Sequence, residues 1–436
     1  MIRFILFLMF LGTTVYAWGY PLDAYERTHI RRLEPALQAH FGGTGKPSLP
    51  SGALLGNSSI EPSGNGVSEL PENDPLLAAK LKQLLGDEAD LYSVSIIDLS
   101  KPDAPRYIAH LDNQIANVGS VGKLLALYAL FDQLARLYPD DVSARERILR
   151  DTWITANDWV ISDHHTVPIY DTDAGRIISR RLRVGDAGNL WEYLDWMISA
   201  SNNSAASIVI QQVILLEQFG HDYPLSDAES QAFLTRTSAR VLGELWLTAM
   251  QRPLVNAGFD LNRIRQGSPF TATAQKRVQG TSSYATSRDL AKLINLIEDQ
   301  RFVDDWSSAE AKRLLYITQR RIRYASHPVL NDAAVYFKSG SYYSCTPEPD
   351  FVCRKYMGNK INRLASTAMI ESPAGSPDLR YIVTVMSNVL RVNSAVAHQT
   401  LALRIHRFVE SLHSNKVPAE SQSSEPSLIN IESLAE

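Results

Sequence analysis

One short motif carries the residue types that nucleophilic catalysis needs. Ser120 is followed three positions later by Lys123, and this S-x-x-K spacing occurs once in the chain. The apolar run from Leu124 to Phe131 predicts a helix, in which residues three apart share a face. A serine hydroxyl becomes a good nucleophile when a neighbouring group takes its proton. The spacing therefore predicts that Lys123 activates Ser120; the alternative is that Ser120 only caps the helix.

Two further motifs follow along the chain. Ser201 to Asn203 has the pattern S-x-N, and Lys338 to Ser341 continues a strand-like apolar run with the pattern K-S-G-S. The S-x-N pattern also occurs at Ser63 to Asn65, whereas K-[ST]-G occurs once. Simpler alternatives are that the second motif caps the next helix and that the lysine of the third is a solvated charge. The order of the three motifs favours one shared site.

In this order the motifs resemble the signature of the penicillin-recognising serine hydrolases, the superfamily of penicillin-binding proteins and β-lactamases. The chain looks like a class A β-lactamase-like member over roughly Asp74 to Ser414. The resemblance implies an α+β, β-lactamase/transpeptidase-like fold. An antiparallel sheet of about five strands would pack against helices, with an all-helical subdomain beside it. It also implies a hydrolase that works through an acyl-enzyme on Ser120.

The resemblance assigns catalytic roles to the first two motifs. Ser120 would be the nucleophile, and Lys123 its base or proton relay. Ser201 would bridge Lys123 and Lys338 and pass a proton to the leaving nitrogen. Asn203 would hydrogen-bond Lys123 and the substrate amide. A lysine must be desolvated or lie near other cations to act as a base near neutral pH, and Lys338 would be such a cation.

The third motif would bind the substrate. By the same resemblance, Lys338 and the Ser339 hydroxyl would hold a substrate carboxylate. Gly340 would leave room for the substrate along the strand edge. The backbone N–H groups of Ser120 and Ser341 would form the oxyanion hole.

The chain departs from the family where class A β-lactamases carry E-x-x-L-N, whose glutamate activates the deacylating water. The corresponding stretch, Gly267 to Arg277, contains no carboxylate. Glu244 lies upstream in a helical pattern and is expected on the surface or in packing, and Asp260 is the one acid between residues 258 and 288. We therefore expect slow deacylation, unless a more distant carboxylate folds into the pocket.

Composition and the two ends of the chain indicate its partners, its compartment and its domain limits. The net charge of −4 gives no basic excess for nucleic-acid binding. Met1 to Ala17 resembles a signal peptide, too short to span a bilayer, so we expect a secreted or periplasmic protein without a stable membrane anchor. We expect an extension or linker over residues 18–73, one domain over 74–414, and a disordered tail over 415–436. We also expect a monomer.

Hydrophobic patterns predict the elements that position the motifs. A helix is expected from Leu76 to Leu85, with Asp74 as its N-cap and Pro75 at its first position. A mostly helical region should run from Lys123 to about Gln319. The predicted strands and final helix are Leu91 to Leu99, Arg106 to His110, Ala334 to Tyr343, Ser366 to Glu371, Tyr381 to Ser387, and the helix Ala395 to Leu412.

Two smaller features concern disulfide and metal chemistry. Cys345 and Cys353 are the two cysteines, and in an exported chain such a pair favours a disulfide over free thiols. Residues 155–180 are interpreted as an insertion in the form of a long hairpin. Within it, Asp163, His164 and His165 could suggest a metal. Adjacent histidines on a strand point to opposite faces, so we expect no metal, and no cofactor elsewhere.

Three functions remain open from the sequence. The first is an exported β-lactamase-like hydrolase acting on β-lactams or related amides. The second is a D,D-carboxypeptidase or penicillin-binding enzyme acting on peptidoglycan peptides. The third is a binding protein that is acylated or occupied without turnover.

Overall fold

The structure, a computed structural model, describes residues 19–20, 24–34, 55–56, 60–171, 174–318 and 321–414. The predicted signal peptide, Met1 to Ala17, and the predicted tail over 415–436 lie outside these ranges and stay predictions. Within the described ranges, no helix is both long enough and apolar enough to cross a bilayer.

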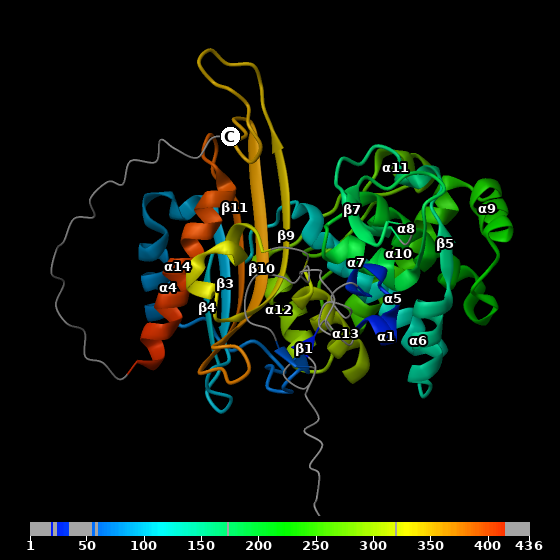
Figure 1. Cartoon of the computed structure of the whole chain (residues 1–436). Coiled ribbons are helices and arrows are strands. Elements are labelled where there is room, and N and C mark those ends of the chain that lie inside the picture. Colours follow the sequence, from blue (N-terminus) through cyan, green and yellow to red (C-terminus); the bar gives the residue numbers. More distant parts are fainter. Residues whose placement is uncertain are drawn as a thin grey trace, which may run out of the picture.

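Five antiparallel strands form the central sheet in the order β4-β3-β11-β10-β9 (Figure 1). Their bounds are Tyr92–Asp98 (β3), Arg106–His110 (β4), Ala334–Ser344 (β9), Ile361–Ser372 (β10) and Leu379–Asn388 (β11). All five strands were predicted, although β10 begins five residues before the expected Ser366. The α+β fold class expected from the sequence is thereby confirmed.

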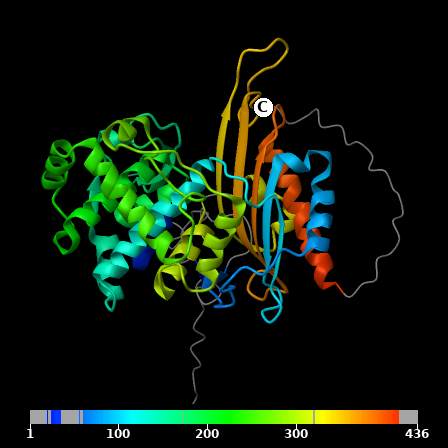
Figure 2. The same ribbon diagram turned by 180° about the vertical axis from the view of Figure 1, so that it is seen from behind.

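Helices cover both faces of this sheet (Figures 1 and 2). On one face lie α4 (Pro75–Leu85) and α14 (Ser394–His413), and on the other α12 (Ser287–Glu298) and α13 (Asp305–Tyr316). Because both faces are covered, β3 is buried along its whole length. Helix α4 begins as predicted, since the Asp74 side chain accepts hydrogen bonds from the backbone N–H groups of Leu76 and Leu77.

Within the described residues, seven further helices form a second part beside the sheet (Figure 1). They are α5 (Lys123–Leu137), α6 (Val142–Asp151), α7 (Leu190–Ile198), α8 (Asn203–Phe219), α9 (Asp227–Arg236), α10 (Ala239–Asn256) and α11 (Ala272–Arg277). Helix α5 is central and contacts α7, α8 and α10. Its residues from Lys123 to Leu134 are all buried. A helix that is buried on every side holds its first turn, and therefore Lys123, in a fixed place.

Described residues within the predicted extension contact both the helical part and α12 on the sheet. Arg32, in the turn after α1 (Ala24–Thr28), pairs with Asp195 of α7, and both side chains are buried. Ile60 is fully buried, and the backbone N–H of Val67 donates to Asn295 of α12. The strands β1 (Gly19–Tyr20) and β2 (Leu55–Gly56) pair with each other. The domain limits stay a prediction, but Arg32 and Val67 are in contact with the domain.

The insertion over residues 155–180 contains a shorter hairpin than expected. Its strands are β6 (Val167–Asp171) and β7 (Arg176–Arg180), while β5 (Trp153–Thr155) pairs with β8 (Ala187–Asn189). Asp163, His164 and His165 precede the hairpin and lie in no strand. The expectation that the two histidines point to opposite faces of a strand was therefore wrong, and their rings stack with centroids 4.3 Å apart.

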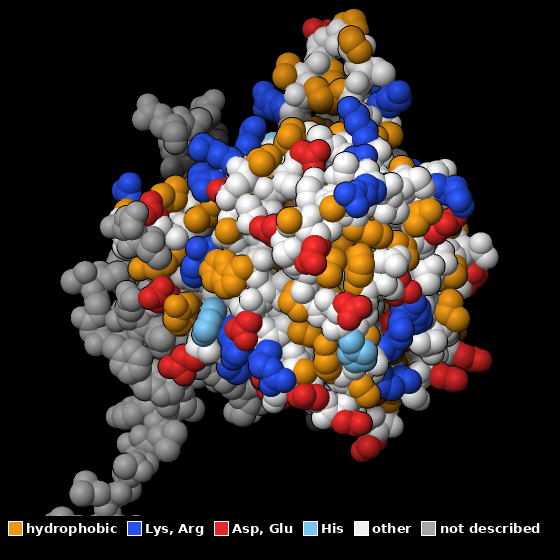
Figure 3. All heavy atoms as spheres, turned by 90° about the vertical axis from the view of Figure 1, so that its right-hand side faces the viewer, with side chains coloured by type: hydrophobic (Ala, Val, Ile, Leu, Met, Phe, Trp, Pro, Cys, Tyr) orange, Lys and Arg blue, Asp and Glu red, His pale blue; other side chains and the backbone are white. Residues whose placement is uncertain are grey.

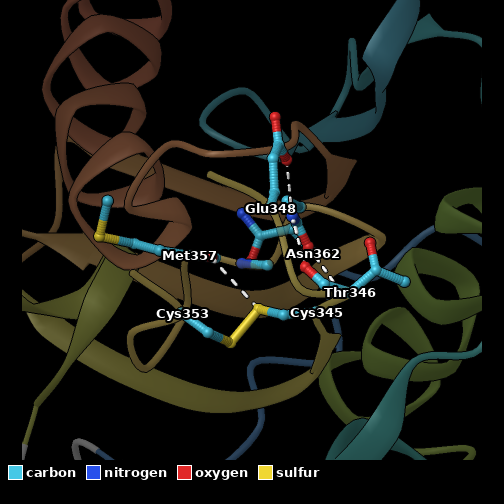
Figure 4. Close-up of a disulfide and its surroundings, with 8 residues drawn as sticks. Cys345, Thr346, Glu348, Cys353, Met357 and Asn362 are labelled. Carbon is cyan, nitrogen blue, oxygen red and sulfur yellow. Dashed lines mark hydrogen bonds between the residues drawn. A yellow bond between two sulfur atoms is a disulfide. The ribbon is translucent and has the colours of Figure 1, made fainter. Parts of the chain in front are cut away.

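The hairpin of β9 and β10 extends beyond the rest of the molecule (Figures 1 and 3). Cys345 and Cys353 form the expected disulfide near its end (Figure 4). The backbone N–H of Thr346 donates to Asn359 Oδ1 at 2.9 Å, and Asn359 in turn donates to Glu348. The bridge closes the loop between the cysteines, and these bonds tie that loop to Asn359 beyond it.

Candidate active site

A cleft of about 960 Å³ opens between the β9 edge of the sheet and the helical part. All three predicted motifs reach it. The lining includes the predicted residues Ser120, Ser201, Asn203, Lys338, Ser339, Gly340 and Ser341. Lys123 lies just behind this surface, with no exposed area of its own.

Ser120 lies in a single 3-10 turn, Gly119–Gly122, that leads into α5. Its hydroxyl accepts a hydrogen bond from Lys123 Nζ at 2.8 Å. The N-cap of α5 is Gly122, with no side-chain cap bond. Ser120 is therefore not the N-cap of this helix.

Lys123 is buried among acceptors and beside an aromatic ring. Besides the Ser120 hydroxyl, its Nζ donates to the Ser201 carbonyl oxygen at 2.6 Å and to Asn203 Oδ1 at 2.7 Å. The Phe270 ring centroid lies 4.9 Å from Nζ. Burial lowers the pKa of Lys123 to about 7; nearby Asp163 raises this pKa and Arg323 lowers it. The amine can therefore be deprotonated near neutral pH.

The S-x-N segment contacts both lysines, as expected, but Ser201 contacts Lys123 through its backbone and not through its side chain. The Ser201 backbone carbonyl accepts from Lys123, while its hydroxyl accepts from Lys338 Nζ at 2.7 Å. Ser201 adopts a left-handed backbone conformation with φ of 57°, which costs a non-glycine residue ~1–3 kcal/mol. The N-cap of α8 is Asn202, whose side chain accepts from Ala205 N–H. Because Asn202 caps the helix, the side chains of Ser201 and Asn203 are left for the lysines.

Lys338 and Ser339 lie in β9 at the cleft edge, and both are buried. Burial lowers the pKa of Lys338 well below its usual value, and the nearby cations Lys123 and Arg323 lower it further. An anion entering the cleft would oppose all three effects and favour the charged form. The Lys338 ammonium is thus suited to hold a bound carboxylate.

Gly340 has a packing role in addition to the predicted one, which stays a prediction. A Cβ atom at this position would overlap the Val118 carbonyl oxygen and approach the backbone nitrogens of Ser120 and Val121. The missing side chain lets β9 pass directly against the turn that carries Ser120. Gly340 therefore sets the distance between the nucleophile and the strand edge.

Sequence patterns did not identify Arg323. It precedes β9 and also has a left-handed conformation, with φ of 54°. Its guanidinium donates to the hydroxyl oxygens of Ser339 at 2.7 Å and Ser341 at 3.2 Å, and it lies over the Tyr356 ring. No local motif marks this arginine, because its contacts depend on how the chain turns into β9.

The wall opposite β9 includes the loop that lacks a carboxylate. It contributes Phe270 to the cleft and continues into the short helix α11. Glu244 lies on an exposed face of α10 and pairs with Arg240, as a surface residue would. The Asp260 carboxylate accepts from Asn262 in its own turn. Neither acid lines the cleft, so neither is in place to act on an acyl-enzyme.

Asp163, His164 and His165 have potential ligand atoms within 4.8 Å of one another. Both oxygens of Asp163 already accept hydrogen bonds. Oδ1 accepts from the backbone and ring of His165, and Oδ2 from the backbone N–H groups of Asn203 and Ser204. A metal would have to displace these donors, so the group fits a hydrogen-bonded cluster better than an ion site.

Comparison with known proteins identifies the family. The model of the beta-lactamase enzyme family matches residues 76–352, which is more than half of the chain. The chain therefore belongs to the beta-lactamase enzyme family, as the motif order predicted. No curated protein matches it significantly.

Solved structures share its fold at low identity. The TLA-3 extended-spectrum beta-lactamase is 12% identical with a TM-score of 0.51, over 78% of this chain and 99% of that one. A mutant of PBP-A, in an acyl-enzyme complex with penicillin G, is 14% identical with a TM-score of 0.49, over 79% and 99%. A beta-lactamase from Sphaerobacter thermophilus is 15% identical with a TM-score of 0.48, over 76% and 96%. The fold shared with the TLA-3 enzyme agrees with the membership of the beta-lactamase enzyme family that the family model shows.

Proposed function

We propose that this protein cleaves β-lactams or related amides through an acyl-enzyme on Ser120. The observation that carries the proposal is the buried Lys123 amine, 2.8 Å from the Ser120 hydroxyl and with a pKa of about 7. In its neutral form the amine can take the hydroxyl proton as Ser120 attacks the carbonyl carbon. The Ser201 hydroxyl would then protonate the leaving nitrogen and regain a proton from the Lys338 ammonium, which donates to it.

Substrate binding follows from the β9 edge of the cleft. Lys338, Ser339 and Arg323 present two cations and a hydroxyl that suit a carboxylate. The backbone N–H groups of Ser120 and Ser341 are proposed as the oxyanion hole. β-Lactam antibiotics and D-alanyl peptides both carry a carboxylate near the reactive amide, so both classes suit this arrangement.

Fluorescent penicillin tests the proposal. It should label the wild-type protein covalently and leave Ser120→Ala unlabelled, with thermal melting to show that the variant is folded. Equal labelling of the two proteins would remove Ser120 as the nucleophile.

A second candidate is a D,D-peptidase, and the lack of a carboxylate on the Gly267 to Arg277 loop favours it. Release of D-alanine from a synthetic peptide ending in D-alanyl-D-alanine would support this activity. A penicillin adduct that never decays, together with no peptide cleavage, would favour the third candidate, a binding protein without turnover.

Export is also part of the proposal. The signal-like pattern of Met1 to Ala17 and the disulfide Cys345–Cys353 support an oxidising compartment. N-terminal sequencing of protein recovered outside the cytoplasm should begin after Ala17.

A further inference from the structure

The loop without a carboxylate is bonded to a second segment, residues 158–166. Thr271 Oγ1 donates to the Trp159 carbonyl oxygen at 2.6 Å, and Thr273 Oγ1 to the Ile161 carbonyl oxygen at 3.0 Å. The backbone N–H of Ala272 donates to Ser162 Oγ at 3.2 Å. The two segments thus form one continuous wall, and His165 of the second segment lines the cleft.

Asp163 and His165, here called the Asp-His pair, are held rigidly in this wall. The Asp163 side chain is 2% exposed, and its Oδ2 accepts from the backbone N–H groups of Asn203 at 2.7 Å and Ser204 at 3.1 Å. Asn202 Nδ2 donates to the His165 carbonyl oxygen at 3.0 Å. The Asp-His pair is therefore attached to the same segment whose Asn203 side chain contacts Lys123.

The hydrogen bond between the pair fixes the state of the imidazole. His165 Nδ1 lies 2.7 Å from Asp163 Oδ1. Burial raises the pKa of Asp163, but the hydrogen bonds to the carboxylate and the nearby His165 ring together hold it well below its usual range. The carboxylate is therefore ionised and can only accept. Nδ1 must then carry the proton, which leaves the lone pair on Nε2. With its side chain 31% exposed, the ring can meet water in the cleft.

We propose that His165, oriented by Asp163, is the general base that activates the water that hydrolyses the Ser120 acyl-enzyme. This inference rests on the proposed function, because it needs an ester on Ser120. It assigns His165 the task that the loop from Gly267 to Arg277 cannot perform. His165 would be a catalytic residue, and Asp163 a positioning residue.

The step balances with the groups present and one water. Nε2 of His165 takes one proton from water as the water oxygen bonds to the ester carbon. The bond between that carbon and Ser120 Oγ then breaks. The proton held by the imidazolium passes to Oγ, and the acid product keeps the other water proton.

The proposed base also predicts a pH dependence. Burial lowers the pKa of His165, while Asp163 raises it and the nearby Lys123 and His164 lower it. These are the charged or titratable groups that act on the ring. Because the neutral ring is the active form, the deacylation rate should fall in acid and be constant above neutral pH.

The test measures acylation and deacylation separately in the full chain. Penicillin G is added, and the mass of the intact protein is followed over time for wild type and His165→Gln. General-base help is typically worth 10²–10⁴-fold, so His165→Gln should deacylate at least about 100-fold more slowly and lose the acid limb of the pH profile. Its acylation rate should change by no more than a few fold.

Two further variants sharpen the result. The matched control His164→Gln removes the exposed neighbouring ring and should keep the wild-type deacylation rate above neutral pH, where the His165 ring is neutral in both proteins. Asp163→Asn should move the acid limb to lower pH, because the carboxylate no longer raises the imidazole pKa. A purely structural role of Asp163 would leave the position of that limb unchanged.

The outcomes separate this inference from the proposed function. Normal acylation with an unchanged deacylation rate in His165→Gln would overturn the role of the Asp-His pair and leave the proposed function intact. Deacylation abolished by a metal chelator would also overturn it, since a metal-bound hydroxide would then be the nucleophile. If neither wild type nor His165→Gln formed an adduct, the proposed function would be overturned, and the role of the Asp-His pair with it.

Discussion

The two walls of the cleft are built in different ways. On the β9 side, Ser120, Lys123 and Lys338 come from short motifs, and hydrogen bonds of 2.7–2.8 Å join them to one another or to Ser201. The wall formed by residues 158–166 and the loop from Gly267 to Arg277 has no motif, and side-chain bonds to backbone groups about 110 positions away hold it together. The residues assigned to attack on the substrate could thus be predicted from sequence motifs. Those assigned to water activation are brought together only by the fold.

The difference shows what local patterns can and cannot predict. The strands of the sheet follow from local periodicity. The cap at Asp74 and the pairing of Ser120 with Lys123 follow from residue types whose contacts are close in sequence. His165 was misjudged because alternation was applied to a segment that is not a strand. His165 is held by Asp163 and, at its carbonyl oxygen, by Asn202, which lies 37 positions away and outside any short window around residue 165.

After loss of Ser120 itself, the largest effect is expected from substitutions of Lys123, the proposed base on the β9 side. Lys123→Met keeps the volume of the side chain and removes the amine, and Lys123→Arg keeps the charge but cannot give up a proton near neutral pH. Both should slow acylation about 10²–10⁴-fold, as measured by stopped flow with a chromogenic cephalosporin. Thermal melting checks that each variant is folded.

The pH profile of wild-type acylation sharpens the same point. Because the neutral amine is the active form, acylation should increase as the pH rises through about 7, the pKa of Lys123, and then level off. The deacylation rate should instead depend on the protonation of His165, whose pKa is lowered from its usual value by burial. If acylation did not vary with pH on either side of the Lys123 pKa, or if Lys123→Met acylated normally, Lys123 would not be the base.

A smaller effect is expected at the substrate-binding edge. Arg323→Gln removes a charged donor beside Ser339 and Ser341. A hydrogen bond to a charged group is worth about 1.5–3 kcal/mol, so the KM for a penicillin should rise roughly 10–100-fold. The methyl ester of the same penicillin lacks the carboxylate and serves as the control, with an expected change below threefold. An equal loss for acid and ester would remove the carboxylate role of Arg323.

The smallest effect is expected at the end of the β9–β10 hairpin. Cys345 and Cys353 are eight positions apart, so the double variant to serine should lose at most about 2–3 kcal/mol of unfolding free energy. Urea denaturation measures this loss. Acylation should stay within twofold of wild type, because the bridge lies beyond the catalytic contacts. A large drop in acylation with unchanged stability would show that the hairpin end takes part in binding.

The most direct measurement for the whole account is to locate the acyl group. His165→Gln is incubated with penicillin G, digested, and its peptides are analysed by mass spectrometry. We expect one penicilloyl group per chain, on the hydroxyl of Ser120. An adduct on any other residue, or stoichiometric acylation that persists in Ser120→Ala, would contradict the account.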